Sequence, residues 1–466
     1  MKTINHIYIN GQFITPHGDE VLELVSPVTE EKITQVRLAD VDDTRQAIAA
    51  AKAAFPAMRL STREQRMAWL QKLHDAVSAR KAELIDTMVE EYGCAVGFAE
   101  ATVNHACDSF LQMRDVLSRF PFETRVGNAR VMMEPLGVVG LITPWNGNYG
   151  FIATKLSTVI ASGSTAVIKP SELSARQTAL IIECMHTAGL PDGVFNIVTG
   201  RGDVVGAEIT RHPDIAKISF TGSTVVGKTI ARGAVDTLKR VTLELGGKSA
   251  NVLLDDADLE QAIPRALQVM SWNSGQACIA GTRLLVHESR LEAVKAQILK
   301  DITQLVPGEN HGTAVTAQQY QRVQNYIRKG IEEGAELLWG GEGRPEGFAR
   351  GYYVKPTVFV NVRNDMTIAQ QEIFGPVLSV ITYKDDAEAI AIANDTVYGL
   401  QAYVSGNDER RTEAVASQLV AGRVFVNGVY NEPQAPFGGF KQSGIGREFG
   451  TFGLEGYLEP KAIMGQ

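Results

Sequence analysis

The chain has 466 residues, of which 44% are hydrophobic and 21% charged, and its formal net charge at pH 7 is -8. This length exceeds the size at which one hydrophobic core stops growing, so we expect a globular protein of two or more domains. The negative charge counts against a nucleic-acid or anionic-membrane surface, because both need a basic face, and it favours a small-molecule ligand.

The N-terminus and the cysteines indicate a cytoplasmic protein with free thiols. Residues 1–6 lead into a polar hairpin pattern without the apolar stretch of an export signal, and no apolar run is long enough to cross a membrane. The cysteines show no CxxC spacing and no neighbouring histidine cluster, which disfavours both a metal site and a disulfide scaffold. They are Cys94, Cys107, Cys184 and Cys278.

The first 135 residues combine a hairpin with long helices. Residues 6–14 alternate around Asn10-Gly11, a strong hairpin signal. Apolar residues at helical spacing predict helices over 41–55 and 62–91. Between 120 and 134 the pattern is strand-like and more apolar than a loop needs, so we expect this segment to pair with another subunit.

From Gly137 short apolar strands alternate with helical stretches. We expect strands at 138–142, 166–168, 194–198, 215–220 and 241–243, with helices over 148–160, 175–188, 204–210 and 225–234 between them. This rhythm predicts right-handed βαβ crossovers and a parallel sheet that is buried on both faces. Ligands of such sheets bind at the carboxyl ends of the strands.

Polar residues or glycines follow each of these strands. The segments are Pro144-Trp145-Asn146, Lys169-Pro170-Ser171-Glu172, Gly200-Arg201-Gly202, Thr221-Gly222-Ser223-Thr224 and Glu244-Leu245-Gly246-Gly247. Gly222 and Ser223 open a helix whose free N–H groups are suited to a pyrophosphate, although Ser223 is alternatively only an N-cap. Lys169 and Glu172 are suited to an adenosine ribose, or alternatively form a solvated ion pair.

A carboxylate, Glu244, and a thiol, Cys278, lie at the two ends of residues 244–278. A thiolate attacks carbonyl carbons, and a carboxylate of raised pKa takes a proton from the water that releases the acyl group. Gly275 and Ala277 leave little bulk beside the sulfur of Cys278. Taken alone, Cys278 is more often a small packing residue, and Glu244 alone is no more informative.

After Cys278 the pattern is less regular. We expect a strand at 284–287, helices over 291–305 and 317–334, and strands near Val358 and Leu378. A glycine-dense run follows at 436–446, and residues 454–463 are expected to form a terminal strand.

Together these pieces resemble the NAD(P)-dependent aldehyde dehydrogenase superfamily along essentially the whole chain. The motifs that carry the resemblance are Pro144-Trp145-Asn146, Lys169-Pro170-Ser171-Glu172, Phe220-Thr221-Gly222-Ser223, Leu243-Glu244-Leu245-Gly246-Gly247-Lys248, Gly275-Gln276-Ala277-Cys278, Glu372-Ile373-Phe374-Gly375-Pro376 and Pro436-Phe437-Gly438-Gly439. The resemblance implies an α/β fold with a Rossmann-like parallel-sheet NAD-binding domain (1–112 and 136–246), an α/β catalytic domain (247–443) and a small β oligomerisation arm (113–135 and 444–466).

The resemblance also implies a role for each site residue. Cys278 would be the nucleophile, Glu244 the general base and Asn146 the donor to an oxyanion, a role for which an amide is chemically suited. The residues implied to bind NAD, with NADP as second choice, are Trp145, Lys169, Glu172, Gly222, Ser223, Glu372 and Phe374. We therefore expect an aldehyde to be oxidised to a carboxylic acid through a cysteine thiohemiacetal and a thioester, which Glu244-activated water hydrolyses.

The chain departs from the commonest family pattern after Asn146, where Gly147-Asn148-Tyr149-Gly150 replaces an aromatic residue and a proline. This loop is expected to line the substrate entrance, so a preference for long apolar aldehydes is in doubt. Further pocket candidates, each alternatively a loop-packing residue, are Tyr149, Trp272, Tyr430, Asn431, Glu432 and Phe437. The physiological aldehyde is not evident in the sequence.

Two other functions stay open. A CoA-acylating dehydrogenase would use a thiol in place of water, and Glu244 counts against it because such relatives generally lack a base there. A non-catalytic protein of this fold would not need Cys278, Asn146 and Glu244 together. The resemblance further implies a homodimer or homotetramer.

Overall fold

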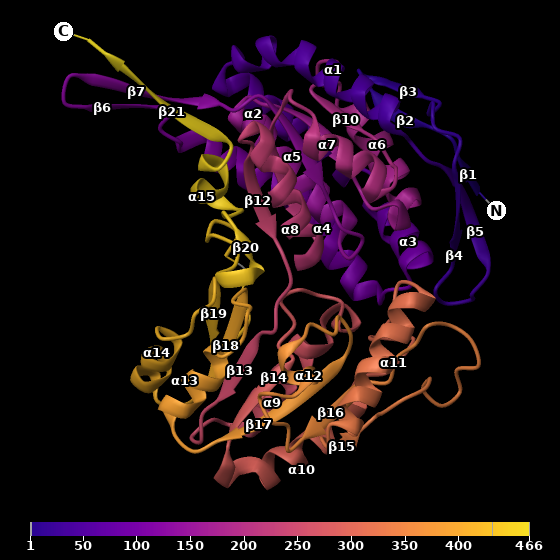
Figure 1. Ribbon diagram of the computed structural model, residues 1–466, viewed down its shortest axis with the longest axis vertical. Coiled ribbons are helices and arrows are strands. Elements are labelled where there is room, and N and C mark those ends of the chain that lie inside the picture. The colour runs from indigo at the N-terminus through magenta and orange to yellow at the C-terminus, as the bar shows by residue number, and fades with distance from the viewer. Residues whose placement is uncertain (1, 431, 466) are drawn as a thin grey trace.

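Two large β-sheets and a three-stranded arm organise the chain (Figure 1). The structure is a computed structural model that describes residues 2–430 and 432–465. One sheet with its helices forms the upper lobe in Figure 1, the second sheet forms the lower lobe, and the arm projects from the upper lobe. The predicted class is confirmed: a Rossmann-like parallel sheet, a second α/β unit and a small β arm.

The first sheet has eight strands in the order β20-β12-β11-β8-β9-β10-β2-β3. They are β2 (Ile7–Ile9), β3 (Gln12–Ile14), β8 (Val138–Ile142), β9 (Thr165–Lys169), β10 (Phe195–Ile197), β11 (Ile215–Thr221), β12 (Arg240–Glu244) and β20 (Gly444–Ile445). Parallel pairing joins β12, β11, β8, β9 and β10 in succession. The five strands predicted between residues 138 and 243 are therefore confirmed.

The predicted hairpin around Asn10-Gly11 is also confirmed. Strands β2 and β3 pair antiparallel, and φ is 51° at Asn10 and 77° at Gly11, as tight hairpin turns require. A separate three-stranded sheet lies near the N-terminus and contains β1 (Lys2–Ile4), β4 (Val21–Val25) and β5 (Lys32–Arg37).

Helices cover both faces of the first sheet. They are α1 (Val41–Arg59), α2 (Arg63–Ser78), α3 (Lys81–Tyr92), α4 (Val96–Arg119), α5 (Asn148–Ser162), α6 (Ala175–Thr187), α7 (Ala207–Arg211) and α8 (Thr224–Ala234). In β8, Val139 and Leu141 pack into the cluster that contains α2 to α6, while Val138 and Ile142 pack toward α1, α7 and α8. Strand side chains alternate between faces, so both faces of β8 must be apolar.

Two helix predictions need correction. The single helix expected over 62–91 is two helices, because Arg80 leaves the helical conformation with φ -119° and ψ 25°. The helix expected over 204–210 begins with a π-helical turn at Gly202–Gly206 and continues as α7. None of the helices in the described part of the chain is both long and apolar enough to cross a membrane.

The second sheet has seven strands in the order β15-β16-β17-β14-β13-β18-β19. Its strands are β13 (Ala250–Leu253), β14 (Arg283–His287), β15 (Glu336–Trp339), β16 (Thr357–Val360), β17 (Val377–Tyr383), β18 (Gln401–Ser405) and β19 (Arg423–Val426), and its helices are α9 (Leu259–Ser271), α10 (Leu291–Asp301), α11 (Ala317–Glu332), α12 (Thr367–Gln370), α13 (Asp386–Asn394) and α14 (Glu409–Ala416). The strands expected at 284–287 and near Val358 and Leu378 are confirmed. The helix expected over 291–305 is shorter, because a 3-10 turn replaces its end at Ile302–Gln304.

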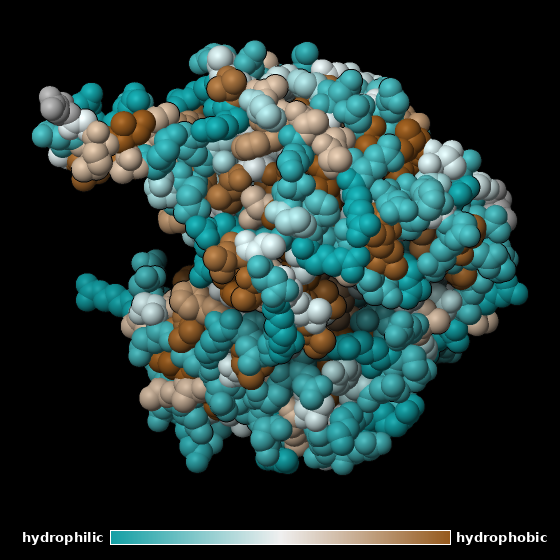
Figure 2. Space-filling model, turned by 45° about the horizontal axis from the view of Figure 1, so that its top comes forward, coloured by the Kyte–Doolittle hydropathy of each residue, from teal (hydrophilic) through white to brown (hydrophobic). Residues whose placement is uncertain are grey.

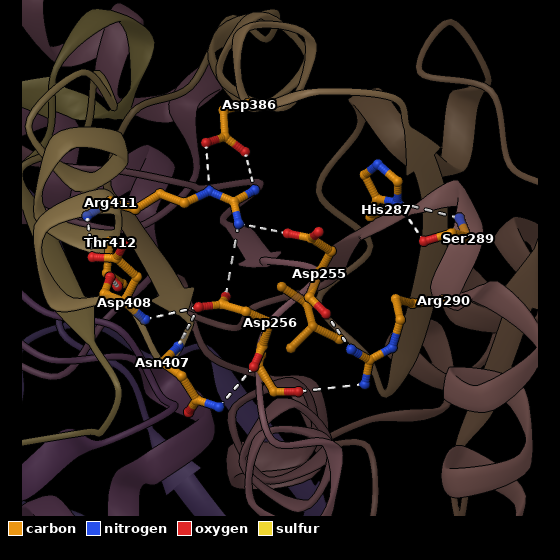
Figure 3. Close-up of polar contacts among 12 residues, drawn as sticks. Asp255, Asp256, His287, Ser289, Arg290, Asp386, Asn407, Asp408, Arg411 and Thr412 are labelled. Atoms are coloured by element: carbon orange, nitrogen blue, oxygen red, sulfur yellow. Dashed lines mark hydrogen bonds and ion pairs between the residues drawn. The ribbon is translucent and has the colours of Figure 1, made fainter.

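Charged side chains join the loops at the outer end of the second sheet (Figure 3). Arg411 of α14 donates two hydrogen bonds to Asp386, at 2.7 and 2.6 Å, and a third to Asp255 at 2.5 Å. Asp256 accepts a hydrogen bond of 2.7 Å from the backbone N–H of Asp408. A two-point contact between arginine and carboxylate fixes orientation as well as charge, so this cluster holds α13 and α14 against the loop after β13.

The arm is an antiparallel sheet of β6 (Glu123–Val126), β7 (Ala129–Pro135) and β21 (Leu458–Met464). It projects from the body with apolar side chains on its surface (Figure 2); Val126 is 67% exposed and Met464 80%. The strand expected over 454–463 begins later, because α15 (Gly450–Glu455) includes its first residues. Pairing of β6 or β7 with another subunit stays a prediction.

Candidate active site

Cys278 follows a short run of left-handed backbone. Asn273, Ser274 and Gly275 have φ values of 53°, 56° and 76°, and such positions are strained for residues other than glycine. A Cβ at Gly275 would lie 2.2 Å from the carbonyl carbon of Gly375, so glycine is required for this close approach. The loop leaves Cys278 partly exposed, whereas the other three cysteines are buried.

Two cavities meet at Cys278. Their volumes are about 240 Å³ and about 220 Å³, and Asn146, Phe151 and Cys278 line both. The first cavity lies between α4, α5 and the C-terminal segment, and the second lies at the carboxyl ends of β8, β11 and β12. A thiol at this junction can reach molecules bound in either cavity.

Asn146 follows β8 and contacts the cysteine loop. Its Nδ2 donates a hydrogen bond to the backbone carbonyl of Gln276 (2.9 Å), and its own backbone carbonyl accepts one from Nδ2 of Asn273 (3.3 Å). A side-chain amide carries two N–H bonds, so one hydrogen is left to donate to a ligand in the cavities. The arrangement can stabilise an oxyanion formed beside Cys278.

Gln276 and Asn273 hold the cysteine loop from within, and the sequence assigned a role to neither side chain. Gln276 donates to the carbonyl of Thr313 (2.9 Å) and accepts from the N–H of Val315 (3.0 Å). Asn273 accepts a hydrogen bond from the hydroxyl of Tyr92 (3.0 Å). These partners lie far away in the sequence and share no local pattern with the loop, so no sequence signal indicated them.

Glu244 ends β12 and lines the second cavity. Its side chain is 2% exposed, and within residues 2–430 and 432–465 neither carboxylate oxygen has a hydrogen-bond partner. Burial raises the pKa of this carboxyl well above its ordinary value, and the charge of Glu448 acts in the same direction. A buried carboxyl of raised pKa next to a reactive cavity has the properties of a general base.

Burial and two nearby carboxylates raise the pKa of the Cys278 thiol. The pKa of Cys278 is raised to about 12, first by burial and then by the charges of Glu372 and Glu244. Backbone N–H groups of Cys278 and Ile279 lower this pKa by less. The thiol is therefore protonated at neutral pH, and the nucleophilic thiolate requires a base or a nearby positive charge.

The second cavity gathers most of the predicted cofactor residues, namely Trp145, Gly222, Ser223, Glu372 and Phe374. Oε1 of Glu372 accepts a hydrogen bond from the N–H of Gly247 (3.1 Å), and burial raises the pKa of Glu372 to about 7. Phe374 has a φ of 61°, and its ring meets that of Trp145 edge-on at 5.5 Å. These groups form one wall of the cavity.

Lys169 and Glu172 lie at the end of β9 and are not among the described residues that line the second cavity. Nζ of Lys169 lies 2.8 Å from Oε2 of Glu172, so the two side chains form an ion pair, but Lys169 is buried and the pair is therefore not the solvated one of the alternative prediction. Ser223 is the N-cap of α8, because its hydroxyl accepts a hydrogen bond from the N–H of Val226. This capping bond leaves the other N–H groups of the first turn free for an anion.

Tyr149 does not reach the first cavity. Its side chain is fully buried, and its hydroxyl donates to the carbonyl of Leu84 (3.2 Å). Gly150 and Phe151 of α5, with Gly147 just before it, line the cavity. Tyr149 lies on another side of the helix and packs into the helical core. We therefore remove Tyr149 from the predicted substrate pocket.

The other pocket candidates divide into two groups. Trp272 and Phe437 line the first cavity. Tyr430 is 66% exposed, Glu432 is exposed as well, and neither is among the described lining residues. Asn431 lies outside the described residues.

Comparisons with known proteins find relatives that match nearly the whole chain. Residues 13–463 match the model of the aldehyde dehydrogenase family. The solved structure of a mutant of aldehyde dehydrogenase C (AldC) from Pseudomonas syringae, in complex with NAD+ and octanal, is 43% identical with a TM-score of 0.97, and the match covers 99% of this chain and 96% of that one. An aldehyde dehydrogenase from Bartonella henselae is 37% identical (TM-score 0.97, 100% of both chains). One from Mycobacterium tuberculosis, in complex with NAD+, is 35% identical (TM-score 0.97, 100% of this chain and 99% of that one).

Proposed function

Because this chain belongs to the aldehyde dehydrogenase family, we propose that it oxidises an aldehyde to a carboxylic acid with NAD. The meeting of two cavities at Cys278 carries the proposal, since Asn146 lines both cavities and Glu244 lines one. The aldehyde binds in the first cavity and the nicotinamide end of NAD in the second.

Cys278 is the nucleophile in this proposal. The thiol first loses its proton to water, and the thiolate sulfur then bonds to the carbonyl carbon. The C=O π bond opens to leave the negative oxygen of a thiohemiacetal, to which Nδ2 of Asn146 donates. Bound NAD supplies a hydride acceptor, and loss of hydride from the thiohemiacetal carbon leaves a thioester on Cys278. Water then attacks the thioester as Glu244 removes its proton, so the acid leaves and the sulfur is released.

The residues that line the second cavity are suited to bind a dinucleotide. Oγ1 of Thr221 is buried without a partner among the described residues, and the first turn of α8 adds free N–H groups. A Cβ at Gly246 would lie 2.5 Å from Oε2 of Glu372, so glycine leaves this carboxyl room. The nicotinamide ribose is held by Glu372 and Phe374, a pyrophosphate oxygen by Ser223, and the adenosine ribose by Lys169 and Glu172.

Glu172 favours NAD over NADP, because its carboxylate repels a 2′-phosphate. The ratio of kcat/KM for the two cofactors tests this preference. A higher ratio for NADP would contradict it.

We further propose a homodimer or homotetramer assembled through the arm. The proposed division of the chain is an NAD-binding domain of 1–112 and 136–246, a catalytic domain of 247–443 and an arm of 113–135 and 444–466. The exposed Val126 and Met464 of the arm support an interface with another copy, since apolar side chains on a projecting hairpin are costly in water. Sedimentation as a monomer would contradict this assembly.

The variant Cys278→Ala tests the reaction. We expect it to bind NAD in calorimetry and to form no NADH from any aldehyde. Cys184→Ala, which changes a buried cysteine outside both cavities, is the matched control and should retain turnover. Persistent turnover by Cys278→Ala would exclude the proposed nucleophile.

Product analysis with and without CoA separates hydrolysis from acyl transfer. We expect the free acid in both cases, because Glu244 is placed to activate water. A CoA thioester as the main product would show that a thiol, and not water, accepts the acyl group.

A further inference from the structure

Two helices present matching faces to the first cavity. Helix α4 contributes Phe98, Ala101, Thr102 and His105, and helix α5 with the residue before it contributes Gly147, Gly150, Phe151 and Thr154. Each set has the spacing i, i+3, i+4, i+7 that lines one face of a helix, and α4 packs directly on α5 (Figure 1).

Both faces begin beside the cysteine loop. The ring of Phe98 meets that of Trp272 edge-on at 5.6 Å, and Asn146 bonds the carbonyl of Gln276. His105 and Thr154 stand at the other end of the two faces, about two helical turns or roughly 10 Å further along each axis. They are therefore far enough from the sulfur to contact the tail of an aldehyde and not its carbonyl.

A chain of hydrogen bonds orients His105. The hydroxyl of Ser109 donates to the backbone carbonyl of His105 (2.7 Å), and the Ser109 and Thr154 hydroxyl oxygens are 3.0 Å apart. A hydroxyl has one hydrogen, so Ser109 has none left and Thr154 must donate to Ser109. Oγ1 of Thr154 then accepts from Nε2 of His105, which lies 3.3 Å away. Nε2 carries the ring hydrogen, and Nδ1 keeps its lone pair.

Nδ1 of His105 has no hydrogen-bond partner within the residues that the structure describes, and it is not among the buried atoms that lack one. It therefore keeps some exposed surface, and His105 is a lining residue of the first cavity. Gly150 permits this position, because a Cβ there would lie 2.9 Å from Cδ2 of the ring. Burial lowers the pKa of His105, so the imidazole is neutral at neutral pH and Nδ1 is an acceptor.

We propose that Nδ1 of His105 accepts a hydrogen bond from the far end of the aldehyde, so that the preferred substrates carry a hydroxyl or N–H donor on a flat apolar body. This rests on the proposed function, since it takes the first cavity as the aldehyde site. The rest of the cavity favours such a body, because its lining includes the aromatic side chains Phe98, Phe151, Trp272, Phe437 and Phe449.

Matched aldehydes test the proposal in the full-length protein. The probes are phenylacetaldehyde, its 4-hydroxy form, which adds a donor, and its 4-methoxy form, which has the oxygen without a donor; benzaldehyde and its 4-hydroxy and 4-methoxy forms repeat the test at a shorter length. In at least one series, kcat/KM for the hydroxy form should exceed that for the other two by roughly tenfold, as one hydrogen bond to a buried acceptor permits. Equal values for the hydroxy and methoxy forms in both series would overturn the proposal.

Two variants test whether the preference for the hydroxy form depends on His105. His105→Phe keeps a ring and removes the acceptor, so kcat/KM for the hydroxy form should fall to that of phenylacetaldehyde, which itself should change by less than about threefold. Thr154→Val keeps the volume and removes the partner of Nε2, and the preference should fall here too. Ser157→Ala is the control, because it deletes a buried hydroxyl of α5 that donates to the carbonyl of Thr154 and does not line the cavity among described residues.

The outcomes separate the two proposals. An unchanged preference in both His105→Phe and Thr154→Val, with NADH still formed from phenylacetaldehyde, would contradict the donor site and leave the aldehyde dehydrogenase activity intact. Folded wild-type protein that forms NADH from octanal but from none of these aromatic aldehydes would also contradict the donor site, whereas one that forms NADH from neither would contradict the proposed function.

Discussion

Replacing Glu244 by glutamine should make the protein more stable and less active at the same time. Glu244→Gln keeps the shape of the side chain and removes its charge. Burial raises the pKa of Glu244 well above 4.5 in the folded protein, so above pH 4.5 the folded state keeps a proton that the unfolded state has lost. The free energy of unfolding of the wild type therefore falls as the pH rises from 4.5 toward the folded-state pKa of Glu244. The free energy of unfolding of the variant does not fall in this way, because position 244 then carries no ionisable group.

The size of the effect follows from linkage. Each pH unit between the unfolded-state and the folded-state pKa of Glu244 lowers the free energy of unfolding of the wild type by about 1.4 kcal/mol relative to the variant. An unfolding entropy of about 2.1 cal/mol/K per residue gives roughly 1 kcal/mol/K for this chain, so the difference in Tm should widen by about 1 °C per pH unit. Neither oxygen of Glu244 has a hydrogen-bond partner among the described residues that would offset the cost of its charge.

Scanning fluorimetry of both proteins from pH 5 upward measures this divergence, which ends at the pH where folded Glu244 loses its proton. Glu455→Gln, at an exposed position of α15, controls for the loss of a carboxylate. The same preparations of Glu244→Gln should release about one equivalent of NADH per site and then stop, because the thioester is not hydrolysed. A Tm difference that stays constant with pH, or a variant that turns over steadily, would refute the reasoning.

Three further predictions concern the junction of the cavities. Asn146→Ala should lower kcat about 10²- to 10³-fold by removing the oxyanion donor; in steady-state kinetics, a loss confined to KM would contradict this role. Gly246→Ala should weaken NAD binding in calorimetry, because its Cβ would lie 2.5 Å from Oε2 of Glu372, and an unchanged Kd would show that Glu372 does not hold the cofactor. Alkylation of Cys278 by iodoacetamide in the cofactor-free protein should accelerate with pH beyond pH 9, because its pKa is raised to about 12; mass spectrometry follows the adduct, and a rate that levels off near pH 7 would disagree.

The parallel sheet could be predicted because its signals are local. Strand β8 is an apolar run that is buried on both faces, and in β12 the last three residues are buried. Polar or glycine residues follow both strands. The break between α2 and α3 at Arg80 was missed, because apolar spacing continues across it and only the backbone changes. The spacing of apolar residues predicts which side of a helix is buried, but it predicts the ends of a helix poorly.

Contacts within the site depend on helix phase and on distant partners. Tyr149 was expected in the pocket because it follows Asn146, yet α5 begins at Asn148 and its phase sends Tyr149 to the core. His105 was not anticipated, because α4 itself was not predicted and its spacing therefore had no face to define. His105 lies at the i+7 position of the α4 face that lines the first cavity.

Strand β20 has a consequence for biosynthesis. Gly444 pairs with Glu244 across about two hundred positions of sequence, and the carbonyl of Ser443 accepts a hydrogen bond from the N–H of Leu245 (2.9 Å). While the chain is still on the ribosome, β12 therefore stays an open sheet edge until about two hundred further residues have emerged and β20 pairs with it. Contacts of such long sequence separation form slowly, so a nascent chain holds its proposed base at an unpaired sheet edge until residues 443–445 have been made.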